Sequence, residues 1–286
     1  MADKVGEVDI RGENISKVVT VYAQKKFKLK PLLANVKSNK WTETYYKEDP
    51  TILTAGGTRD IKEIGRFSEF PTLRRSWTKT SADHLKYGGE DYISMEDILT
   101  DAIPVQARTI DGITEGIVNS VDAAIYAKLT AETATSGTVA AVANWDATAS
   151  ATRDPIQDIL RGEQAMMENN YDALAGGVLL CNPHDYASLM MNSKVINNPS
   201  FKTADVVSNG KVGQIAGLNI VVSTSVTDDE AMIIIANKTA TWQSVVDLKT
   251  DVTVEPGKHT RIRSWMIGQI QIHHPKAIYT ITGTEE

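Results

Sequence analysis

The side chains best suited to chemistry in this sequence are five histidines and a single cysteine, and their spacing argues against an active site. A zinc hydrolase needs two histidines four positions apart on one helix with a glutamate between them, and no pair here has that spacing. His273 and His274 are adjacent, so on a strand they would face opposite sides of the sheet and could not hold one metal ion. We therefore predict structural or surface roles for all five, which are His84, His184, His259, His273 and His274.

The cysteine, Cys181, ends an apolar run, Gly177–Cys181, that has the length of a strand. A free cysteine in such a run usually behaves as a small buried hydrophobic residue. No neighbouring base marks its thiol as a nucleophile, and a chain with one cysteine cannot form an internal disulfide. We predict a packing role.

The densest acidic group is Asp228-Asp229-Glu230, which stands between two strand-like runs. A loop that binds a hard cation usually alternates its oxygen ligands along the chain, and these three acids are consecutive. We therefore predict a hydrophilic turn rather than a metal site.

Motifs that bind phosphate or activate a serine are missing. The sequence contains neither the Walker-type loop nor G-x-G-x-x-G, and Gly210, Gly213 and Gly217 have the wrong spacing for the latter. Serine does not occur at nucleophile-elbow spacing. The sequence therefore predicts a protein that is not an enzyme and that uses no cofactor or metal.

Composition places the chain among ordinary globular proteins. Of its 286 residues, 42% are hydrophobic and 23% are charged, and the formal net charge is -6. This charge argues against wholesale electrostatic attachment to nucleic acid. No apolar run approaches the ~20 residues that cross a bilayer, and the polar start lacks a signal peptide's apolar segment. We expect synthesis in the cytoplasm and no membrane partner.

Residues 1–48 have the pattern of an arm rather than of a compact domain. Between Ile15 and Thr42 there are seven lysines and no acidic residue. Apolar residues within this stretch follow helical spacing, which predicts a short amphipathic helix through Ile15, Val18, Val19 and Tyr22. Three readings of the charge are open: a solvated arm, a strap on acidic surfaces of neighbouring proteins, or a segment that faces nucleic acid through Lys25, Lys26, Lys28 and Lys30.

Residues 49–88 predict a hairpin that projects from the body. From Arg74 to Lys86 polar side chains occupy both alternating faces, so this strand cannot lie in the core of its own subunit. A turn is indicated near Gly65–Pro71. Because isolated hairpins are marginal in water, this one should lie on a neighbour. We expect its contacts to come from Arg59, Lys62, Glu63, Arg66, Arg74, Arg75 and Trp77.

The strongest helix pattern follows Pro104, a residue suited to a first helical turn. Apolar residues recur every three or four positions from Ile110 to Leu129, and about 28 residues would make roughly 40 Å of helix. Gly112 and Gly116 weaken such a helix by about 1 kcal/mol each, so we expect something to pack closely against them.

The remaining chain predicts a mixed α+β body with much of its sheet late in the sequence. Thr133–Ser150 has a loop composition, and Asp154-Pro155-Ile156-Gln157 has the pattern of a capped helix start. A strand at Val178–Cys181 precedes a helix that starts at Asn182. Further strands are expected at Gln214–Val222, Ala231–Ala236, Trp242–Val254, Arg261–Ile272 and Ala277–Ile281.

Four stretches in this order resemble the tailed-phage major capsid proteins of the Hong Kong 97-like fold. Tyr87–Ala102 is similar to the family's passage from hairpin to long helix, and Ile110–Thr130 is similar to that helix. Leu179–Tyr186 is similar to a "V-x-N-P-x-D-W/Y" signature. Ile215–Val222 is similar to a "G-x-P-V-V" strand, with Leu218-Asn219 in place of the usual proline.

The resemblance implies a shell subunit with five segments: an N-terminal arm (1–48), an E-loop (49–88), a peripheral domain (89–150 and 246–286) built on a spine helix, and an axial domain (151–245). It implies hexamers and pentamers in an icosahedral capsid around double-stranded DNA, bound without sequence preference. A portal and possible decoration proteins are further implied partners. Because the segment before the E-loop is short, we expect assembly to use a separate scaffolding protein or a short arm. No cross-linking partner can be assigned to Lys62, Lys79 or Lys86.

One alternative within the same fold is an encapsulin, a nanocompartment shell that encloses protein cargo. The acid-free lysine arm favours a genome container over it. An enzyme with an unrecognised site is the alternative from another class, and a cleft with clustered titratable groups would reveal it.

Overall fold

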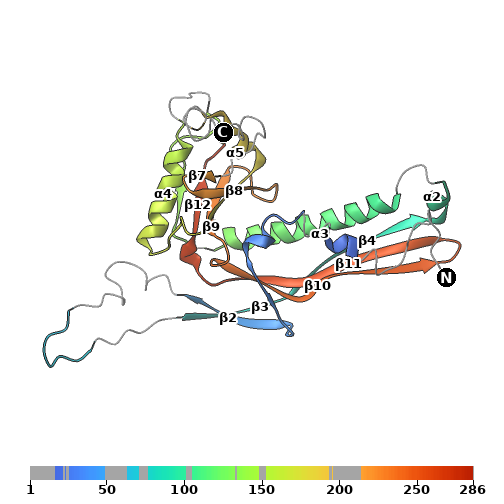
Figure 1. Ribbon diagram of the computed structural model, residues 1–286, viewed down its shortest axis with the longest axis horizontal. Coiled ribbons are helices and arrows are strands. Elements are labelled where there is room, and N and C mark those ends of the chain that lie inside the picture. Colours follow the sequence, from blue (N-terminus) through green and yellow to red (C-terminus); the bar gives the residue numbers. More distant parts are fainter. Residues whose placement is uncertain are drawn as a thin grey trace.

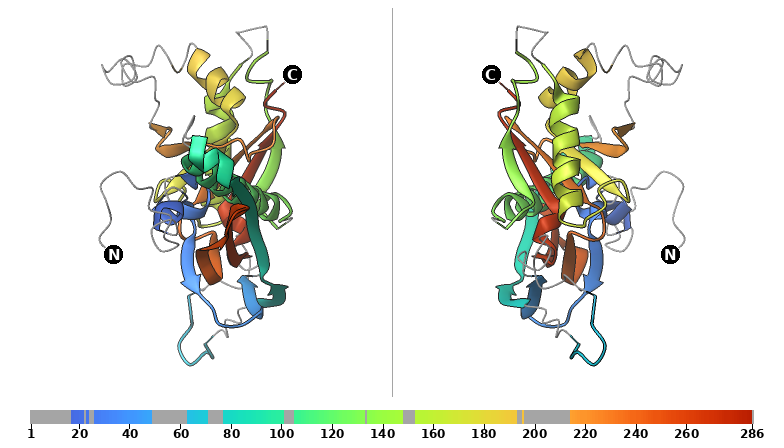
Figure 2. Two further views of the ribbon diagram at one scale, coloured as in Figure 1. Left: turned by 90° about the vertical axis from the view of Figure 1, so that its right-hand side faces the viewer. Right: turned by 90° about the vertical axis from the view of Figure 1, so that its left-hand side faces the viewer.

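The computed structural model describes residues 17–21, 23, 26–48, 63–70, 77–100, 105–132, 134–147, 153–192, 195 and 214–285. Figure 1 shows a long sheet with a helix along it, a compact group of strands and helices near one end, and a hairpin that projects. We call these the elongated module, the compact module and the projecting hairpin. The end views place the compact module and the projecting hairpin on opposite sides of the long sheet (Figure 2).

The elongated module is a four-stranded sheet with one helix on its face. The strand order is β1–β10–β11–β4, with β1 parallel to β10 and the other neighbours antiparallel. The strands are β1 (Ala34–Lys37), β10 (Ala240–Glu255), β11 (His259–Ile272) and β4 (Leu85–Ser94). A short helix, α2 (Met95–Thr100), follows β4.

The predicted spine helix is confirmed as α3, Val105–Thr130, which has 26 residues. Its apolar stripe packs on the sheet because each member recurs on one side of the helix, and all are buried: Ile110, Ile113, Ile117, Val121, Ile125 and Leu129. None of the described helices is long and apolar enough to cross a membrane.

The expected close neighbour of Gly112 and Gly116 is not found among the described residues. Both glycines are exposed, and a Cβ built on either would meet no heavy atom within 4 Å. The apolar stripe turns toward the sheet, and this leaves the two glycines on the open side of the helix.

The compact module contains a six-stranded sheet with the order β5–β12–β9–β6–β8–β7. Its strands are β5 (Gly137–Ala140), β12 (Ile278–Thr282), β9 (Glu230–Ile235), β6 (Gly177–Cys181), β8 (Leu218–Val222) and β7 (Gln214–Ile215). Two helices accompany it, α4 (Pro155–Glu168) and α5 (Pro183–Met191). The predicted caps are present, since Asp154 accepts a hydrogen bond from the Gln157 N–H and Asn182 accepts one from the His184 N–H.

The central strands of the six-stranded sheet, β6, β9 and β12, are buried on both faces, and one of the two buried clusters joins them to α3 of the elongated module. Val178 and Leu180 of β6 belong to the cluster around α3, whereas Leu179 faces the cluster that includes Ile159 of α4. All five residues of β6 are buried for this reason. The modules are therefore packed together rather than joined by a linker.

Sheet pairing differs from the expected segment boundaries in two places. Gly137–Ala140, expected to be a loop within 89–150, forms β5 and pairs in parallel with β12. β12 itself, expected with residues 246–286 in the peripheral domain, pairs with β9 in the compact module. The short Ala-, Thr- and Ser-rich stretch becomes a strand because β12 supplies an edge for it.

The projecting hairpin is an antiparallel pair of β2 (Thr42–Glu48) and β3 (Trp77–Asp83), which form a separate two-stranded sheet. It therefore begins at Thr42, within the segment that we expected to be arm. A turn in the described tip is closed by the Ser68 N–H, which donates to the Gly65 carbonyl at 3.1 Å. Two short 3-10 helices, Lys30–Leu32 and Pro275–Ala277, complete the described elements.

Candidate functional site

The described residues contain no group of three or more histidine, cysteine, aspartate or glutamate side chains that could hold a metal ion. Cys181 is fully buried, and desolvation together with the negative charge of Asp185 raises the pKa of its thiol to about 12. The thiol is therefore protonated and inaccessible at neutral pH, as a packing residue would be.

The histidines have structural partners. His184 Nδ1 lies 2.7 Å from Glu285 Oε1, His274 Nδ1 lies 3.0 Å from Glu48 Oε2, and buried His84 Nδ1 lies 2.8 Å from the Trp41 carbonyl. The His259 ring packs edge-on against Tyr92. Burial lowers the pKa of His273, the remaining one.

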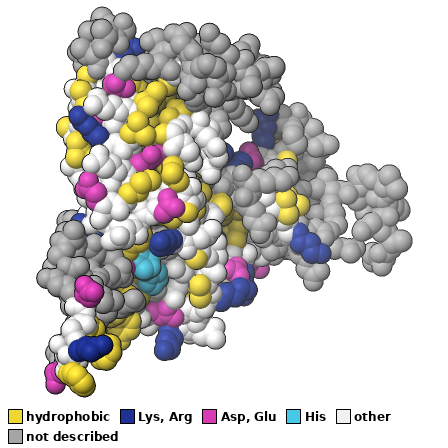
Figure 3. Space-filling view, turned by 60° about the vertical axis from the view of Figure 1, so that its left-hand side comes forward, with side chains coloured by type: hydrophobic (Ala, Val, Ile, Leu, Met, Phe, Trp, Pro, Cys, Tyr) yellow, Lys and Arg dark blue, Asp and Glu magenta, His cyan; other side chains and the backbone are white. Residues whose placement is uncertain are grey.

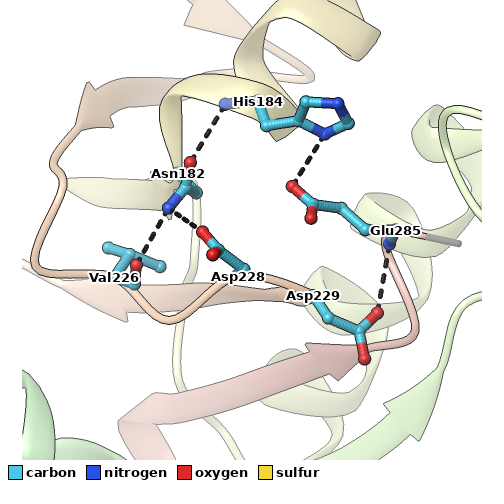
Figure 4. A network of polar contacts seen from close by, with 6 residues as sticks. All are labelled: Asn182, His184, Val226, Asp228, Asp229 and Glu285. Atoms are coloured by element: carbon cyan, nitrogen blue, oxygen red, sulfur yellow. Dashed lines mark hydrogen bonds and ion pairs between the residues drawn. The ribbon is translucent and has the colours of Figure 1, made fainter.

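A polar network ties the end of the described chain to α5 (Figure 4). The Asn182 amide donates to the Val226 carbonyl at 3.1 Å and to Asp228 Oδ1 at 2.6 Å. Asp229 Oδ1 accepts a hydrogen bond from the Glu285 N–H at 3.1 Å. The acidic stretch that begins at Asp228 therefore organises a turn through hydrogen bonds to the chain itself, in agreement with the predicted hydrophilic turn.

Asp185 lies beneath this network and is fully buried. Desolvation is the largest cause that raises its pKa to about 6, and the charge of Glu285 adds to it.

The root of the projecting hairpin is fastened to both modules. Lys47 forms an ion pair with Glu132, just beyond the end of α3, and the Glu132 side chain is only 7% exposed. Glu48 is buried and accepts a hydrogen bond from the Tyr171 hydroxyl at 2.8 Å, beside His274. The end of β2 at Lys47 and Glu48 is thus held against the body.

The described tip of the hairpin is open to solvent. Of the side chains predicted to make intersubunit contacts, Glu63, Arg66 and Trp77 are described and exposed. The others, Arg59, Lys62, Arg74 and Arg75, lie outside the described residues. Sequence reasoning missed Phe67 and Phe70 at the tip, which are 106% and 84% exposed. Phe67 also has a φ of 67°, a conformation that is uncommon for a bulky side chain.

The described part of the lysine arm lies on α3. Helical residues at 17–21, 23 and 26 confirm a short helix. Of its predicted apolar stripe, Val19 is buried but Val18 is 41% exposed, and Ile15 and Tyr22 lie outside the described residues. Lys26 forms an ion pair with Asp111, and its ammonium lies 3.6 Å from Glu115. The Lys30 ammonium lies over the rings of Phe27 and Trp242, where desolvation lowers its pKa.

These contacts engage two of the four lysines expected to face nucleic acid. Lys28 is exposed, and Lys25 lies outside the described residues. The DNA-facing role stays a prediction, and among the described lysines of that group it rests mainly on Lys28.

Asp122 of α3 anchors the arm, and sequence reasoning did not identify it. Its carboxylate accepts backbone hydrogen bonds from Lys28 at 2.8 Å, Leu29 at 3.3 Å and Lys30 at 3.3 Å. Burial raises the pKa of Asp122, and the three N–H donors oppose that rise. The sequence did carry a signal for this anchor, because Asp122 is an acidic residue that directly follows Val121 of the apolar stripe.

Charge on the visible face of the subunit is mixed. Figure 3 shows lysine, arginine and acidic side chains interspersed over the described surface rather than gathered by sign. This face therefore lacks the one-sided basic patch that strong nucleic-acid binding needs.

Comparison with models of known protein families gives one match. A family model described as phage capsid protein matches residues 77–281, which is more than two thirds of the sequence. The chain therefore belongs to the phage capsid protein family. No curated protein matches it.

Solved structures agree in fold across nearly the whole chain. The capsid of the cyanophage P-SCSP1u has a TM-score of 0.69 at 12% identity, covering 100% of this chain and 93% of that chain. A virus-like particle from Pyrococcus furiosus has a TM-score of 0.65 at 13% identity, covering 95% of this chain and 99% of that chain. The mature capsid of bacteriophage PhiM1 has a TM-score of 0.63 at 11% identity, covering 99% of this chain and 90% of that chain.

At these identities the structures establish the fold, which is α+β and Hong Kong 97-like. Together with the family match, they make the chain a major capsid protein that assembles with its own copies into a capsid shell. The nanocompartment alternative is not favoured, because the matching family is that of phage capsids.

Proposed function

We propose that copies of this chain form hexamers and pentamers of an icosahedral shell around double-stranded DNA, without catalysis. The elongated module acts as the peripheral domain, the compact module as the axial domain, and the projecting hairpin as the E-loop. The observation that carries this proposal is the hairpin, whose root is fastened while its tip exposes two phenylalanines to water. An exposed apolar tip on a two-stranded hairpin is stable only when a neighbour covers it.

Deletion of Gly65–Pro71 tests the assignment. The deleted chain should remain soluble and folded, because the described tip residues make no contribution to either buried cluster. Negative-stain electron microscopy should then show single subunits or small oligomers in place of closed shells. Normal shells from the deleted chain would refute the E-loop assignment.

We further propose that the arm faces the packaged genome. Each lysine that neutralises a phosphate should add close to one unit to the salt dependence of DNA binding, without sequence preference. Because Lys26 and Lys30 also have contacts inside the subunit, a Lys25→Gln/Lys28→Gln chain should be compared with the chain in which all four lysines are glutamine.

The genome-facing role is supported if the Lys25→Gln/Lys28→Gln chain already forms normal empty shells but fails to retain DNA. Failed assembly with unchanged DNA affinity would instead make the arm a strap between subunits. A separate scaffolding protein, a portal and decoration proteins belong to the same proposal, as does assembly in the host cytoplasm into a virion capsid.

A further inference from the structure

The root of the projecting hairpin rests on its own subunit through polar contacts. No residue of β2 or β3 belongs to either buried hydrophobic cluster. The Gln271 amide donates instead to Glu43 Oε2 of β2 at 3.4 Å. The Gln269 amide, with its NH₂ group turned toward β3, donates to the carbonyls of Ala82 and Asp83 at 3.2 and 3.1 Å. Because water can replace such hydrogen bonds at little net cost, the hairpin can turn away from the body without exposing a hydrophobic core.

Three of the five histidines gather at this root. His84 joins β3 to β4, and His273 and His274 directly follow β11. The other two, His184 and His259, lie on α5 and at the start of β11. Histidine is the side chain whose ordinary pKa, about 6.5, lies between pH 5 and 8. A modest fall in pH would therefore add up to three positive charges where the hairpin meets the body.

The His84 ring is enclosed and is only 1% exposed. Its Nδ1 lies 2.8 Å from the Trp41 carbonyl, and because a carbonyl only accepts, Nδ1 carries the hydrogen of the neutral ring. Nε2 is buried and has no hydrogen-bond partner among the described residues. Protonation would give Nε2 an N–H and the ring a charge that no described group accepts. A charged His84 therefore opposes the position that the hairpin has here.

His273 contacts β2 directly. Its ring packs edge-on against Tyr45, with 5.9 Å between the ring centres, and its Nδ1 lies 3.4 Å from the Tyr46 carbonyl. Burial lowers the pKa of His273, the charge of His274 adds to this, and the Tyr46 carbonyl opposes it. A histidine whose pKa is lowered in the docked state stabilises that state fully above its ordinary value of about 6.5. This contribution is lost as pH falls below that value.

His274 acts in the opposite direction. Its Nδ1 lies 3.0 Å from Glu48 Oε2 and 3.1 Å from the Tyr171 hydroxyl, so a charged ring would strengthen the contact with the carboxylate. The His274 side chain is 29% exposed, however, and water weakens such a pair. Other charged groups at the root are Glu43, Asp83, Lys47 with its partner Glu132, and Lys238, which lies over the Tyr171 ring.

We propose that His84, His273 and His274 form a pH-sensitive latch, which holds the hairpin against its own subunit near neutral pH and releases it on acidification. Two of the three favour the docked hairpin only while they are neutral, and they outweigh the single partly exposed pair that favours it when charged. The latch concerns the angle of the hairpin within one subunit. It therefore goes beyond the proposed function and does not depend on contacts between subunits.

Single-molecule fluorescence energy transfer on full-length, isolated subunits tests the latch. Dyes on Glu69→Cys at the tip and Gln157→Cys on α4 report the distance between hairpin and body, since both positions are exposed and Cys181 is fully buried. Between about pH 7.5 and about pH 5.5 a second population should appear, with a midpoint below about 6.5. A control pair, Gln157→Cys with Lys249→Cys on β10, spans the body alone and should not respond. An unchanged distribution for the hairpin pair would refute the latch.

Substitutions by glutamine assign the response to individual histidines. His84→Gln and His273→Gln keep a donor for the facing carbonyl but cannot become charged, so each should at least halve the fraction of subunits that respond. His274→Gln should enlarge this fraction, because it removes the opposing charge. His184→Gln and His259→Gln are matched controls outside the root and should respond like the natural chain.

These outcomes separate the latch from general acid unfolding and from the proposed role of the hairpin in the shell. If His84→Gln lowers the thermal midpoint at neutral pH, His273→Gln carries the test alone, because His273 is only partly buried. A full response in His273→Gln, or an equal loss of response in His184→Gln, would overturn the assignment. Shell assembly is not the readout, so a wrong E-loop assignment would leave the result unchanged.

Discussion

Replacing Asp122 with alanine should free the lysine arm from α3. The carboxylate is the acceptor for three consecutive backbone N–H groups, those of Lys28, Leu29 and Lys30. An unsatisfied buried N–H costs about 1–3 kcal/mol. The Leu29 donor is buried, whereas the other two hydrogen bonds are only partly buried.

The three unsatisfied N–H groups should therefore lower the free energy of unfolding by about 3 kcal/mol. Part of this loss is offset, because the substitution also removes a carboxylate that is costly to bury. We expect a net destabilisation of about 2–3 kcal/mol. At 2–4 °C per kcal/mol for a large domain, the thermal midpoint should fall by roughly 5–10 °C. Asp122→Asn should fall between the natural chain and Asp122→Ala, because an amide oxygen still accepts hydrogen bonds but its NH₂ group faces donors.

Two assays distinguish release of the arm from general unfolding. Differential scanning calorimetry measures the midpoint, and limited trypsin digestion measures cleavage after Lys26 and Lys28 under native conditions. Glu115→Ala is the matched control, since it removes an acid from the same helix that makes only a surface ion pair. If Asp122→Ala leaves both the midpoint and the cleavage rate at the level of Glu115→Ala, the anchoring role is wrong.

Three further predictions concern the interior. Ile117→Ala, at 3% exposure on the α3 stripe, should lower the free energy of unfolding by about 2–5 kcal/mol in chemical denaturation; an unchanged value would mean that this face does not pack on the sheet. Cys181 should resist iodoacetamide in the folded chain and react once urea unfolds it, and rapid native labelling would contradict its burial. The raised pKa of Asp185 means that this carboxyl's stabilising contribution is fully present below about pH 4 and is lost as pH rises through about 6. Asp185→Asn should remove up to about 3 kcal/mol of pH dependence from that window, and an unaltered stability–pH curve would refute the assignment.

Periodic sequence features led directly to their elements. The α3 stripe recurs from Ile110 to Leu129, over about five helical turns, so only one face could turn inward. The late β-rich runs became β10, β11 and β12 within a few residues. The polar alternation before Lys86 likewise indicated a strand outside the core, and β3 lies in its own two-stranded sheet.

The features that sequence reasoning missed depend on contacts between distant residues. β5 has the composition of a loop, and only the edge of β12, about 140 positions later, makes it a strand. The lysine arm has no local acid, so the ion pair of Lys26 with Asp111 and the anchoring of the arm's backbone by Asp122 became visible only when the arm lay on α3. The spacing of Gly112 and Gly116 in α3 led us to expect a close neighbour, and none of the described residues supplies it.

The β10–β11 ribbon has a mechanical consequence. At about 3.3 Å per residue, the 16 residues of β10 span roughly 50 Å, from the compact module to the distal turn at Gly257. Tension along the strands would load the hydrogen bonds between β10 and β11 together rather than one after another. The register shifts between Ser244 and Lys249 are the place where that ladder is interrupted. A shell under internal pressure would therefore strain this subunit first by bending near the bulges, while the distal half of the ribbon moves as a stiff rod.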